Sequence, residues 1–179
     1  MKKYILAALL VTFTIAGFSS ITYTYDQRFL KSKNEDPNLL MFCAGAYNFT
    51  RSNSKYKTGA LQLEFKGPSF FGKKTLKIKP FAALMGNFQG SLWLGAGVNF
   101  DISFSDWLVV TLGFGPGLFY KGGGKDLGYP LEMRSSAEIA YRFKSKSRFG
   151  VQFYHLSNAS LASRNPGTEV LLLFYAIPI

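Results

Sequence analysis

One short stretch near the C-terminal end contains one residue of each type found in a serine hydrolase triad. It reads FYHLSNASLASRNPGTEV and holds His155, the only histidine, then Ser157 two residues later and Glu169 twelve residues after the serine. A serine hydroxyl becomes a good nucleophile when an imidazole accepts its proton and a carboxylate orients that imidazole. Two interpretations follow: a catalytic triad of an esterase, or polar residues at the rim of a strand followed by an ordinary loop.

Composition limits the chemistry that these residues can support. The chain has 179 residues, which suits a single domain, and 17% of them are aromatic, a high share for a small soluble domain. The lone Cys43 excludes an intramolecular disulfide, and with one histidine and one cysteine we expect no zinc site, no other metal and no cofactor. The formal net charge of +11 indicates an anionic partner such as phospholipid head groups, a phosphorylated glycolipid or nucleic acid.

The N-terminus has the pattern of an export signal. Lys2 and Lys3 precede an apolar run over 5–16, and small residues follow at Gly17 and Ser19. The apolar run is too short to span a bilayer, so it predicts a cleaved signal peptide over 1–19. Residues 20–38 lack a strand pattern and are expected to form a periplasmic lead-in. Because the chain is predicted to be exported, nucleic acid is a disfavoured partner.

The rest of the chain alternates apolar and polar residues with a period of two, which is typical of strands with one apolar face. In LWLGAGVNFDISF, for example, Leu94, Val98 and Phe100 fall on one face, and Asn99 and Asp101 on the other. The pattern predicts eight strands, at about 40–49, 58–66, 75–87, 91–104, 107–121, 131–144, 148–158 and 168–178.

Such strands fit a soluble sandwich with the apolar face inward, or a membrane barrel with that face toward lipid. The barrel is favoured because the strands are long, the polar faces carry both charge signs, and the signal peptide exports the chain. We therefore predict an all-β fold, an eight-stranded antiparallel transmembrane β-barrel over 39–179, in the outer membrane of a Gram-negative bacterium. Short turns such as FSDW lie at one end and long connections at the other, which we expect to be extracellular.

The face on which His155 and Ser157 lie is unusual for polar residues. Alternate residues of a strand share a face, so both lie with Phe153 on the apolar, lipid-facing side near the extracellular end. Polar groups there are costly unless they serve a purpose. The strand at 168–178 is apolar on both faces, so its pattern leaves open the direction in which Glu169 points.

The segment His155-Leu156-Ser157-Asn158, followed by Asn165-Pro166-Gly167 and Glu169, resembles the active-site segment of the PagL lipid A 3-O-deacylase family, also described as acyloxyacyl hydrolases. The resemblance implies an eight-stranded barrel that acts on lipid A, the anchor of lipopolysaccharide. It also implies roles: Ser157 as nucleophile, His155 as general base and Glu169 as the group that orients the imidazole. Oxyanion support would come from Asn165, the backbone N–H of Ser160 and, more weakly, Asn158.

Three hypotheses of function result. The first is an outer-membrane serine esterase that removes an ester-linked acyl chain of lipid A, at the 3-O position by the resemblance. Basic residues in the outer connections would then contact its phosphates, notably Lys121, Lys125 and Arg164. The second is a non-catalytic structural or adhesin-type barrel. The third is a phospholipase or acyltransferase with the same triad. The sequence leaves the acyl position and the oligomeric state open.

Overall fold

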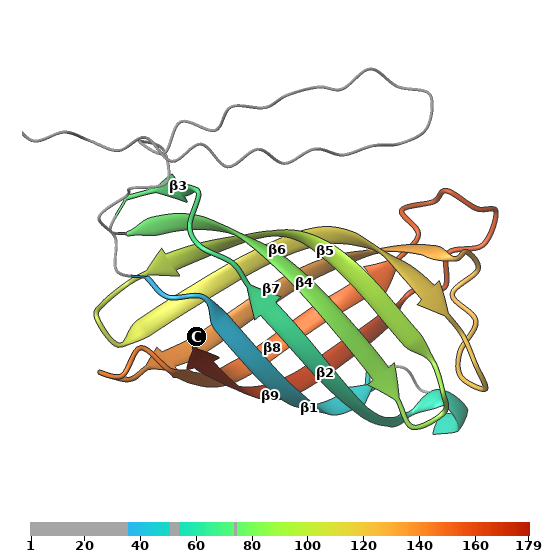
Figure 1. Cartoon of the computed structure of the whole chain (residues 1–179). Helices are drawn as coiled ribbons and strands as arrows, with labels where there is room; N and C mark the ends of the chain where they lie inside the picture. The colour runs from blue at the N-terminus through green and yellow to red at the C-terminus, as the bar shows by residue number, and fades with distance from the viewer. Residues whose placement is uncertain (1–35, 51–53, 74) are drawn as a thin grey trace, which may run out of the picture. The chain divides into compact units, whose positions relative to one another are not determined.

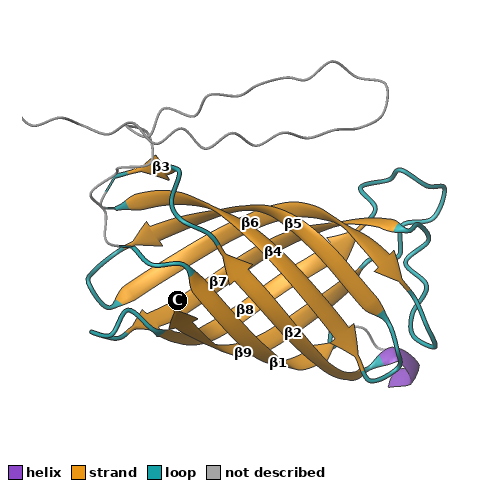
Figure 2. Cartoon of the chain, viewed as in Figure 1, coloured by secondary structure: helices purple, strands orange, loops and turns teal. Residues whose placement is uncertain are grey.

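The computed structural model describes residues 36–50, 54–73 and 75–179, which form a closed barrel of antiparallel strands (Figure 1). The predicted signal peptide and most of the predicted lead-in lie outside these residues. Figure 2 shows the strands in orange and one short 3₁₀ helix, η1 (Ser54–Tyr56), in purple. The strands are β1 (Leu39–Tyr47), β2 (Thr58–Lys66), β3 (Phe71–Gly72), β4 (Leu76–Asn87), β5 (Leu92–Ser103), β6 (Leu108–Tyr120), β7 (Leu131–Arg142), β8 (Arg148–Ser157) and β9 (Thr168–Pro178).

The barrel closes because the first and last long strands pair. β1 pairs with β9 from Leu39 opposite Pro178 to Tyr47 opposite Val170, and on its other edge it pairs with β2. All eight predicted strands are present, with ends that differ by a residue or two, so the predicted fold class is confirmed. No helix among the described residues is long and apolar enough to cross a membrane.

The connection at 67–75 differs from the prediction because it contains an extra pairing. β2 ends at Lys66 opposite Phe81, so the first residues of β4 have no partner from β2. β3 turns back onto this edge, with Phe71 opposite Ile78. An unpaired strand edge exposes backbone donors and acceptors, and a two-residue strand reduces that exposure. This explains why the connection is longer than the other two at its end of the barrel.

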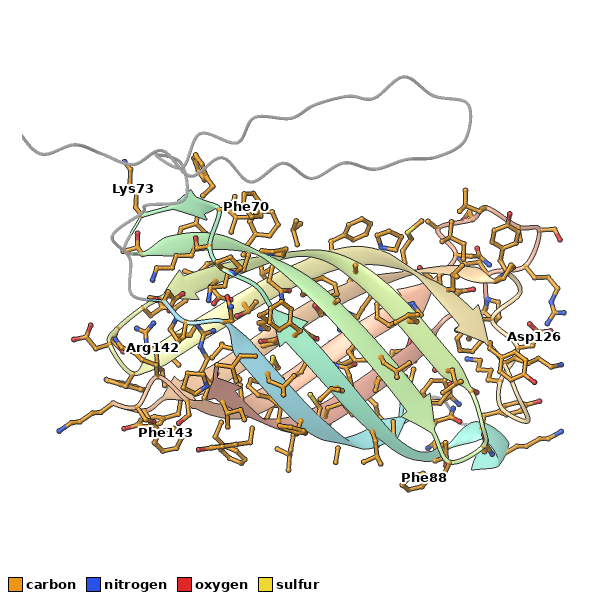
Figure 3. All side chains as sticks on the ribbon, in the orientation of Figure 1. Phe70, Lys73, Phe88, Asp126, Arg142 and Phe143 are labelled. Atoms are coloured by element: carbon orange, nitrogen blue, oxygen red, sulfur yellow. The ribbon has the colours of Figure 1, made fainter. Side chains whose placement is uncertain are left out.

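The two faces of the strands have the predicted character. Large apolar side chains such as Leu94, Phe114 and Ile139 are exposed on the outside of the barrel. Figure 3 shows Phe88 and Phe143 projecting away from the ribbon at opposite ends. Near Phe143, the rings of Trp107 and Tyr141 lie 6.1 Å apart, and those of Tyr141 and Phe143 lie 4.9 Å apart. Aromatic residues at the two ends of an apolar outer band are typical of barrels that span a membrane.

Several charged pairs lie in the interior of the barrel. Arg134 Nη1 lies 2.8 Å from Glu64 Oε2, and neither side chain is exposed to solvent. Similar pairs join Lys66 to Glu138 at 2.6 Å and Arg148 to Asp101 at 2.8 Å. The Arg134 guanidinium also stacks on the Phe81 ring at 4.0 Å. An eight-stranded barrel is just wide enough for side chains to fill it, and here the paired charges share that space with a cluster of buried apolar side chains.

The described end of the lead-in joins the barrel at its short-turn end. Asp36 Oδ2 lies 2.9 Å from Lys79 Nζ and 3.4 Å from Lys77 Nζ, and the Asn38 carbonyl accepts a hydrogen bond from the N–H of Ile179. Burial acts to raise the pKa of the Asp36 carboxyl, but the neighbouring cations, Lys79 above all, outweigh it and hold the pKa below its usual value. Residues 36–38 are thereby fixed beside the C-terminus.

The interior pairs predict a large effect on stability. Arg134→Met should destabilise the folded barrel by about 3–5 kcal/mol, because the Glu64 carboxylate would remain buried without its cation. Urea unfolding in detergent, followed by heat-modifiable migration in gels, measures this. The double variant Glu64→Gln/Arg134→Met is the control and should recover part of the loss, since no lone charge remains. A single Arg134→Met variant as stable as the wild type would show that the pair does not support the barrel.

Candidate active site

His155 and Glu169 face each other at the end of the barrel that carries the long connections. They are direct partners in the pairing of β8 with β9, and His155 Nδ1 lies 3.3 Å from Glu169 Oε1. Both side chains point outward, 39% and 14% exposed, on the face that carries Phe153 and Leu171. The direction of Glu169, which the sequence left open, is therefore toward His155. A carboxylate at Nδ1 leaves Nε2 as the nitrogen that can accept a proton.

Ser157 lies two residues after His155 on the same outward face, opposite Met133 of β7. Its hydroxyl forms no hydrogen bond within the described part of the chain. Catalytic hydrogen bonds are often long in ligand-free sites and shorten when substrate binds. The structure therefore brings all three predicted triad residues to one rim, with the histidine–carboxylate contact formed and the serine beside it.

Gly167 packs closely against the imidazole of His155. Gly167 has φ of +54°, and a Cβ added there would lie 2.7 Å from His155 Cε1 and 2.9 Å from His155 Nε2. Only a residue without a side chain permits this approach, and the left-handed backbone also favours glycine. From the sequence, Gly167 was named only as part of the segment that resembles the family's active-site segment, without a role of its own. In the structure it limits where the imidazole can lie.

The loop between β8 and β9 is organised by Asn158. Its fully buried side chain donates to the carbonyls of Leu127 at 3.2 Å and Arg164 at 2.8 Å, and it accepts from the N–H of Ser160 at 3.1 Å. Its own N–H donates to Asn165 Oδ1 at 3.1 Å. The Ser160 N–H, a predicted oxyanion donor, is therefore already engaged, whereas Asn165 is exposed and keeps its side-chain NH₂ as a donor.

Lys125, one of the three predicted phosphate contacts, forms hydrogen bonds with the loops around the site. Its ammonium donates to the Gly167 carbonyl and, at 3.1 Å, to Asn48 Oδ1. The N–H of Asn48 in turn donates to the Glu169 carbonyl at 2.8 Å. Lys125 thus joins the connection after β6 to the residues that flank His155 and Glu169. Lys121 and Arg164, the other two predicted phosphate contacts, are exposed.

This arrangement predicts how Lys125 affects catalysis. Lys125→Met should lower kcat roughly tenfold with little change in KM, because the lost hydrogen bonds hold the loop rather than the substrate. Steady-state kinetics in detergent micelles separates the two parameters. Lys121→Met removes the same charge from an exposed position and should leave kcat near the wild-type value. A rise in KM without a fall in kcat for Lys125→Met would instead indicate direct binding of a substrate anion.

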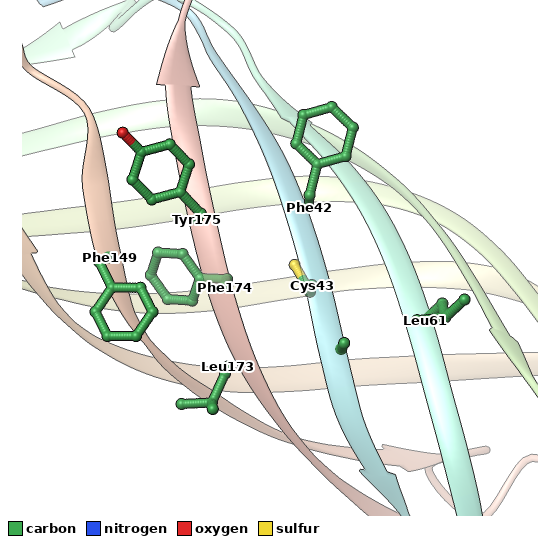
Figure 4. Close-up of a pocket in the computed structure, with 8 residues that line it drawn as sticks. Phe42, Cys43, Leu61, Phe149, Leu173, Phe174 and Tyr175 are labelled. Carbon is green, nitrogen blue, oxygen red and sulfur yellow. The ribbon is translucent and has the colours of Figure 1, made fainter.

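A shallow depression lies on the outward face below these residues. Its volume is about 420 Å³, and it is bordered by side chains of β1, β2, β8 and β9, among them Phe42, Leu61, Phe149, Leu173 and Tyr175 (Figure 4). It does not include His155, Ser157 or Glu169. Leu173 follows Glu169 by four residues, which corresponds to about 13 Å along a strand. The depression is therefore part of the apolar surface next to the site and not the site itself.

The sequence predicted His155, Ser157 and Glu169 as a triad, but it did not predict the groups that contact them. Thr50 Oγ1 donates to Glu169 Oε2 at 2.6 Å, across 119 residues of sequence. These groups come from the connections between strands that contain Asn48, Thr50 and Lys125, and the composition of those connections does not indicate a contact with the site. Among the described residues, no cluster of histidine, cysteine and carboxylate side chains is arranged to hold a metal ion.

The fold defines the class of protein: an eight-stranded β-barrel of the outer-membrane type, with polar residues gathered on its outer rim. The model of the family described as lipid A 3-O-deacylase (PagL) matches residues 44–178, so this chain belongs to that family, as the motif predicted. Family membership makes it an outer-membrane β-barrel of the lipid A deacylase group.

A solved structure of an outer membrane enzyme has the same fold. The crystal structure of the outer membrane enzyme PagL is 22% identical, with a TM-score of 0.64 over 79% of this chain and 99% of that chain. The outer membrane protein Ail of Yersinia pestis, solved in a phospholipid bilayer nanodisc, is 9% identical, with a TM-score of 0.48 over 80% of this chain and 100% of that chain. A search of curated protein sequences finds no match.

Proposed function

We propose that this chain is a serine esterase of the outer membrane that hydrolyses an ester-linked acyl chain of lipid A, at the 3-O position. The observation that carries the proposal is the His155–Glu169 contact beside Ser157, on the apolar outer face of the barrel at one rim. Membership of the lipid A 3-O-deacylase family supplies the substrate. The role of each residue follows from its position in this arrangement.

The reaction begins when Ser157 Oγ attacks the ester carbonyl carbon and His155 Nε2 accepts the hydroxyl proton. The tetrahedral intermediate collapses, the bond from the carbonyl carbon to the sugar oxygen breaks, and His155 returns the proton to that oxygen. An acyl group then remains on Ser157. Water, deprotonated by His155, attacks this acyl-enzyme; the fatty acid leaves and Ser157 regains its proton. Glu169 stabilises the imidazolium in both steps.

The negative charge that develops on the carbonyl oxygen of the ester in the tetrahedral intermediate requires a hydrogen-bond donor. The side-chain NH₂ of Asn165 is the candidate, since its carbonyl oxygen is held by the N–H of Asn158. A preorganised donor is most effective where water is scarce, and the rim of a membrane barrel provides such an environment. Asn158 contributes indirectly, because it shapes the loop that presents Asn165.

The outer surface explains how a lipid would reach the site. Below His155 and Glu169 the same face carries Phe153, Leu171 and Leu173, so an acyl chain lying along the barrel stays in contact with apolar side chains. Its ester bond would then lie at the height of Ser157. The exposed Lys121 and Arg164 would contact phosphates of the head group.

Purified protein in detergent micelles tests this function against its alternatives. Release of fatty acid from lipid A, but not from diacyl phospholipid, is the expected result. Release from phospholipid alone would favour a phospholipase, and transfer of the acyl group to an added acceptor lipid would favour an acyltransferase. The absence of hydrolysis from either lipid would favour a structural or adhesin-type barrel.

The proposal also requires the site to face the outer leaflet. Gly123→Cys, in the long connection after β6, should react with a membrane-impermeant maleimide on intact cells, whereas Ser145→Cys, in the tight turn after β7, should not. The native Cys43 is buried and gives a low background. Labelling of Ser145→Cys alone would place the site at the periplasmic leaflet.

A further inference from the structure

Thr50 contacts the Glu169 carboxylate from a part of the chain far from the His155 segment. Its Oγ1 donates to Glu169 Oε2 at 2.6 Å, while Glu169 Oε1 lies 3.3 Å from His155 Nδ1. A hydrogen bond to a charged acceptor is shorter and stronger than one between neutral groups. The two oxygens of one carboxylate therefore contact a hydroxyl donor and the imidazole.

The two residues before Thr50 contact the two strands that carry His155 and Glu169. The N–H of Asn48 continues the β1–β9 ladder by donating to the Glu169 carbonyl at 2.8 Å. Asn48 then turns the chain with φ of +55°, a conformation that asparagine tolerates better than most residues. Phe49 next packs edge-on against Phe153 of β8, with ring centroids 6.1 Å apart. Thr50 thus follows two fixed contacts, one with each strand of the site.

From this geometry we infer that Thr50 is a positioning residue, which fixes the plane of the Glu169 carboxylate so that Oε1 stays at His155 Nδ1. The terminal torsion of a glutamate has a broad energy minimum, so an unrestrained carboxylate at an open rim would rotate. A rotated carboxylate would release the imidazole from the orientation that presents Nε2 to Ser157. Thr50 acts through Glu169 and does not contact the substrate. The inference rests on the proposed function.

Two substitutions at this position separate the hydroxyl from the shape of the side chain. Thr50→Val keeps the β-branched shape and removes the donor, whereas Thr50→Ser keeps the donor. Thr50→Val should lower kcat for lipid A deacylation roughly tenfold with KM nearly unchanged, as expected for loss of one hydrogen bond to a charged group. Thr50→Ser should restore most of kcat. Heat-modifiable migration should be the same for both.

A double-mutant cycle with Glu169→Ala tests whether Thr50 acts through Glu169. If it does, Thr50→Val should have no further effect on the residual activity of Glu169→Ala, because the group that it orients is gone. An additive loss, a native kcat in Thr50→Val, a change confined to KM, or a Thr50→Ser variant no better than Thr50→Val would each overturn the assignment.

The wild type and Ser157→Ala, assayed alongside, distinguish a failure of the role assigned to Thr50 from a failure of the proposed function. Wild-type hydrolysis that requires Ser157, combined with an unaffected Thr50→Val, overturns only the role of Thr50. A wild-type protein without Ser157-dependent hydrolysis overturns the proposed function and the role of Thr50 with it.

Discussion

Ser157→Ala should lower the rate of lipid A deacylation by about three orders of magnitude or more, since no activated oxygen nucleophile remains. His155→Ala should have a comparable effect, because the two residues act as a unit. Fatty acid released by purified protein in micelles gives both rates. The barrels should remain heat-modifiable, because both side chains lie on the outer face and outside the charged interior.

A second outward serine provides the matched control. Ser135 of β7 is exposed and lies directly opposite His155. Ser135→Ala removes a hydroxyl from the same surface and should leave the rate close to that of the wild type. If both serine variants retained native activity, the ester would be cleaved elsewhere. If Ser135→Ala alone were inactive, the nucleophile would be wrongly assigned.

Gly167→Ala should lower the rate about 100-fold with the barrel intact. The new Cβ would lie less than 3 Å from two atoms of the His155 ring, so either the imidazole or the loop must move. A displacement of about 1 Å at a catalytic group is sufficient for a loss of this size. Steady-state kinetics measures the loss, and the fall should appear mainly in kcat.

Gly90→Ala separates the contact with His155 from backbone strain. Gly90 also has a positive φ, +82°, and lies in a turn at the same end of the barrel, but a Cβ there meets no atom closer than 4.0 Å. Both variants therefore carry the cost of a left-handed alanine, and only Gly167→Ala crowds the imidazole. Equal kinetics for the two variants would contradict the proposed role of Gly167.

Most of the fold could be predicted from the alternation of residues. In 92–103 every second residue is apolar, and in 131–142 every second residue except Ser135 is apolar; a strand that faces lipid on one side requires such a pattern. β3 could not be predicted, because its two residues pair only to cover an edge of β4 left open where β2 ends. That edge depends on the stagger of neighbouring strands, which no local pattern contains.

The site was predictable where its residues are close in sequence. His155 and Ser157 share a face because they are two residues apart. The direction of Glu169 was not predictable, since β9 is apolar on both faces, with Val170 and Leu172 inside and Leu171 and Leu173 outside. It is set by register, which places Glu169 opposite His155.

The contacts that support the site could not be predicted from the sequence. Lys125 was predicted as a phosphate contact because a loop lysine has the right charge for one. In the structure it holds Asn48 and the Gly167 carbonyl, partners that lie 77 and 42 residues away. Thr50 likewise comes from a connection 119 residues before Glu169. Such contacts depend on how the connections meet above the closed barrel, which sequence spacing does not encode.

Mass spectrometry of lipid A from cells that express this chain tests the central claim most directly. The host should carry lipid A that is acylated at the 3-O positions, and Ser157→Ala should be expressed to the same level in the outer membrane. The wild type should yield lipid A lighter by one ester-linked acyl chain, and the Ser157→Ala cells should yield unmodified lipid A. Unmodified lipid A in both, or the same loss in both, would contradict the assignment of a Ser157-dependent lipid A deacylase.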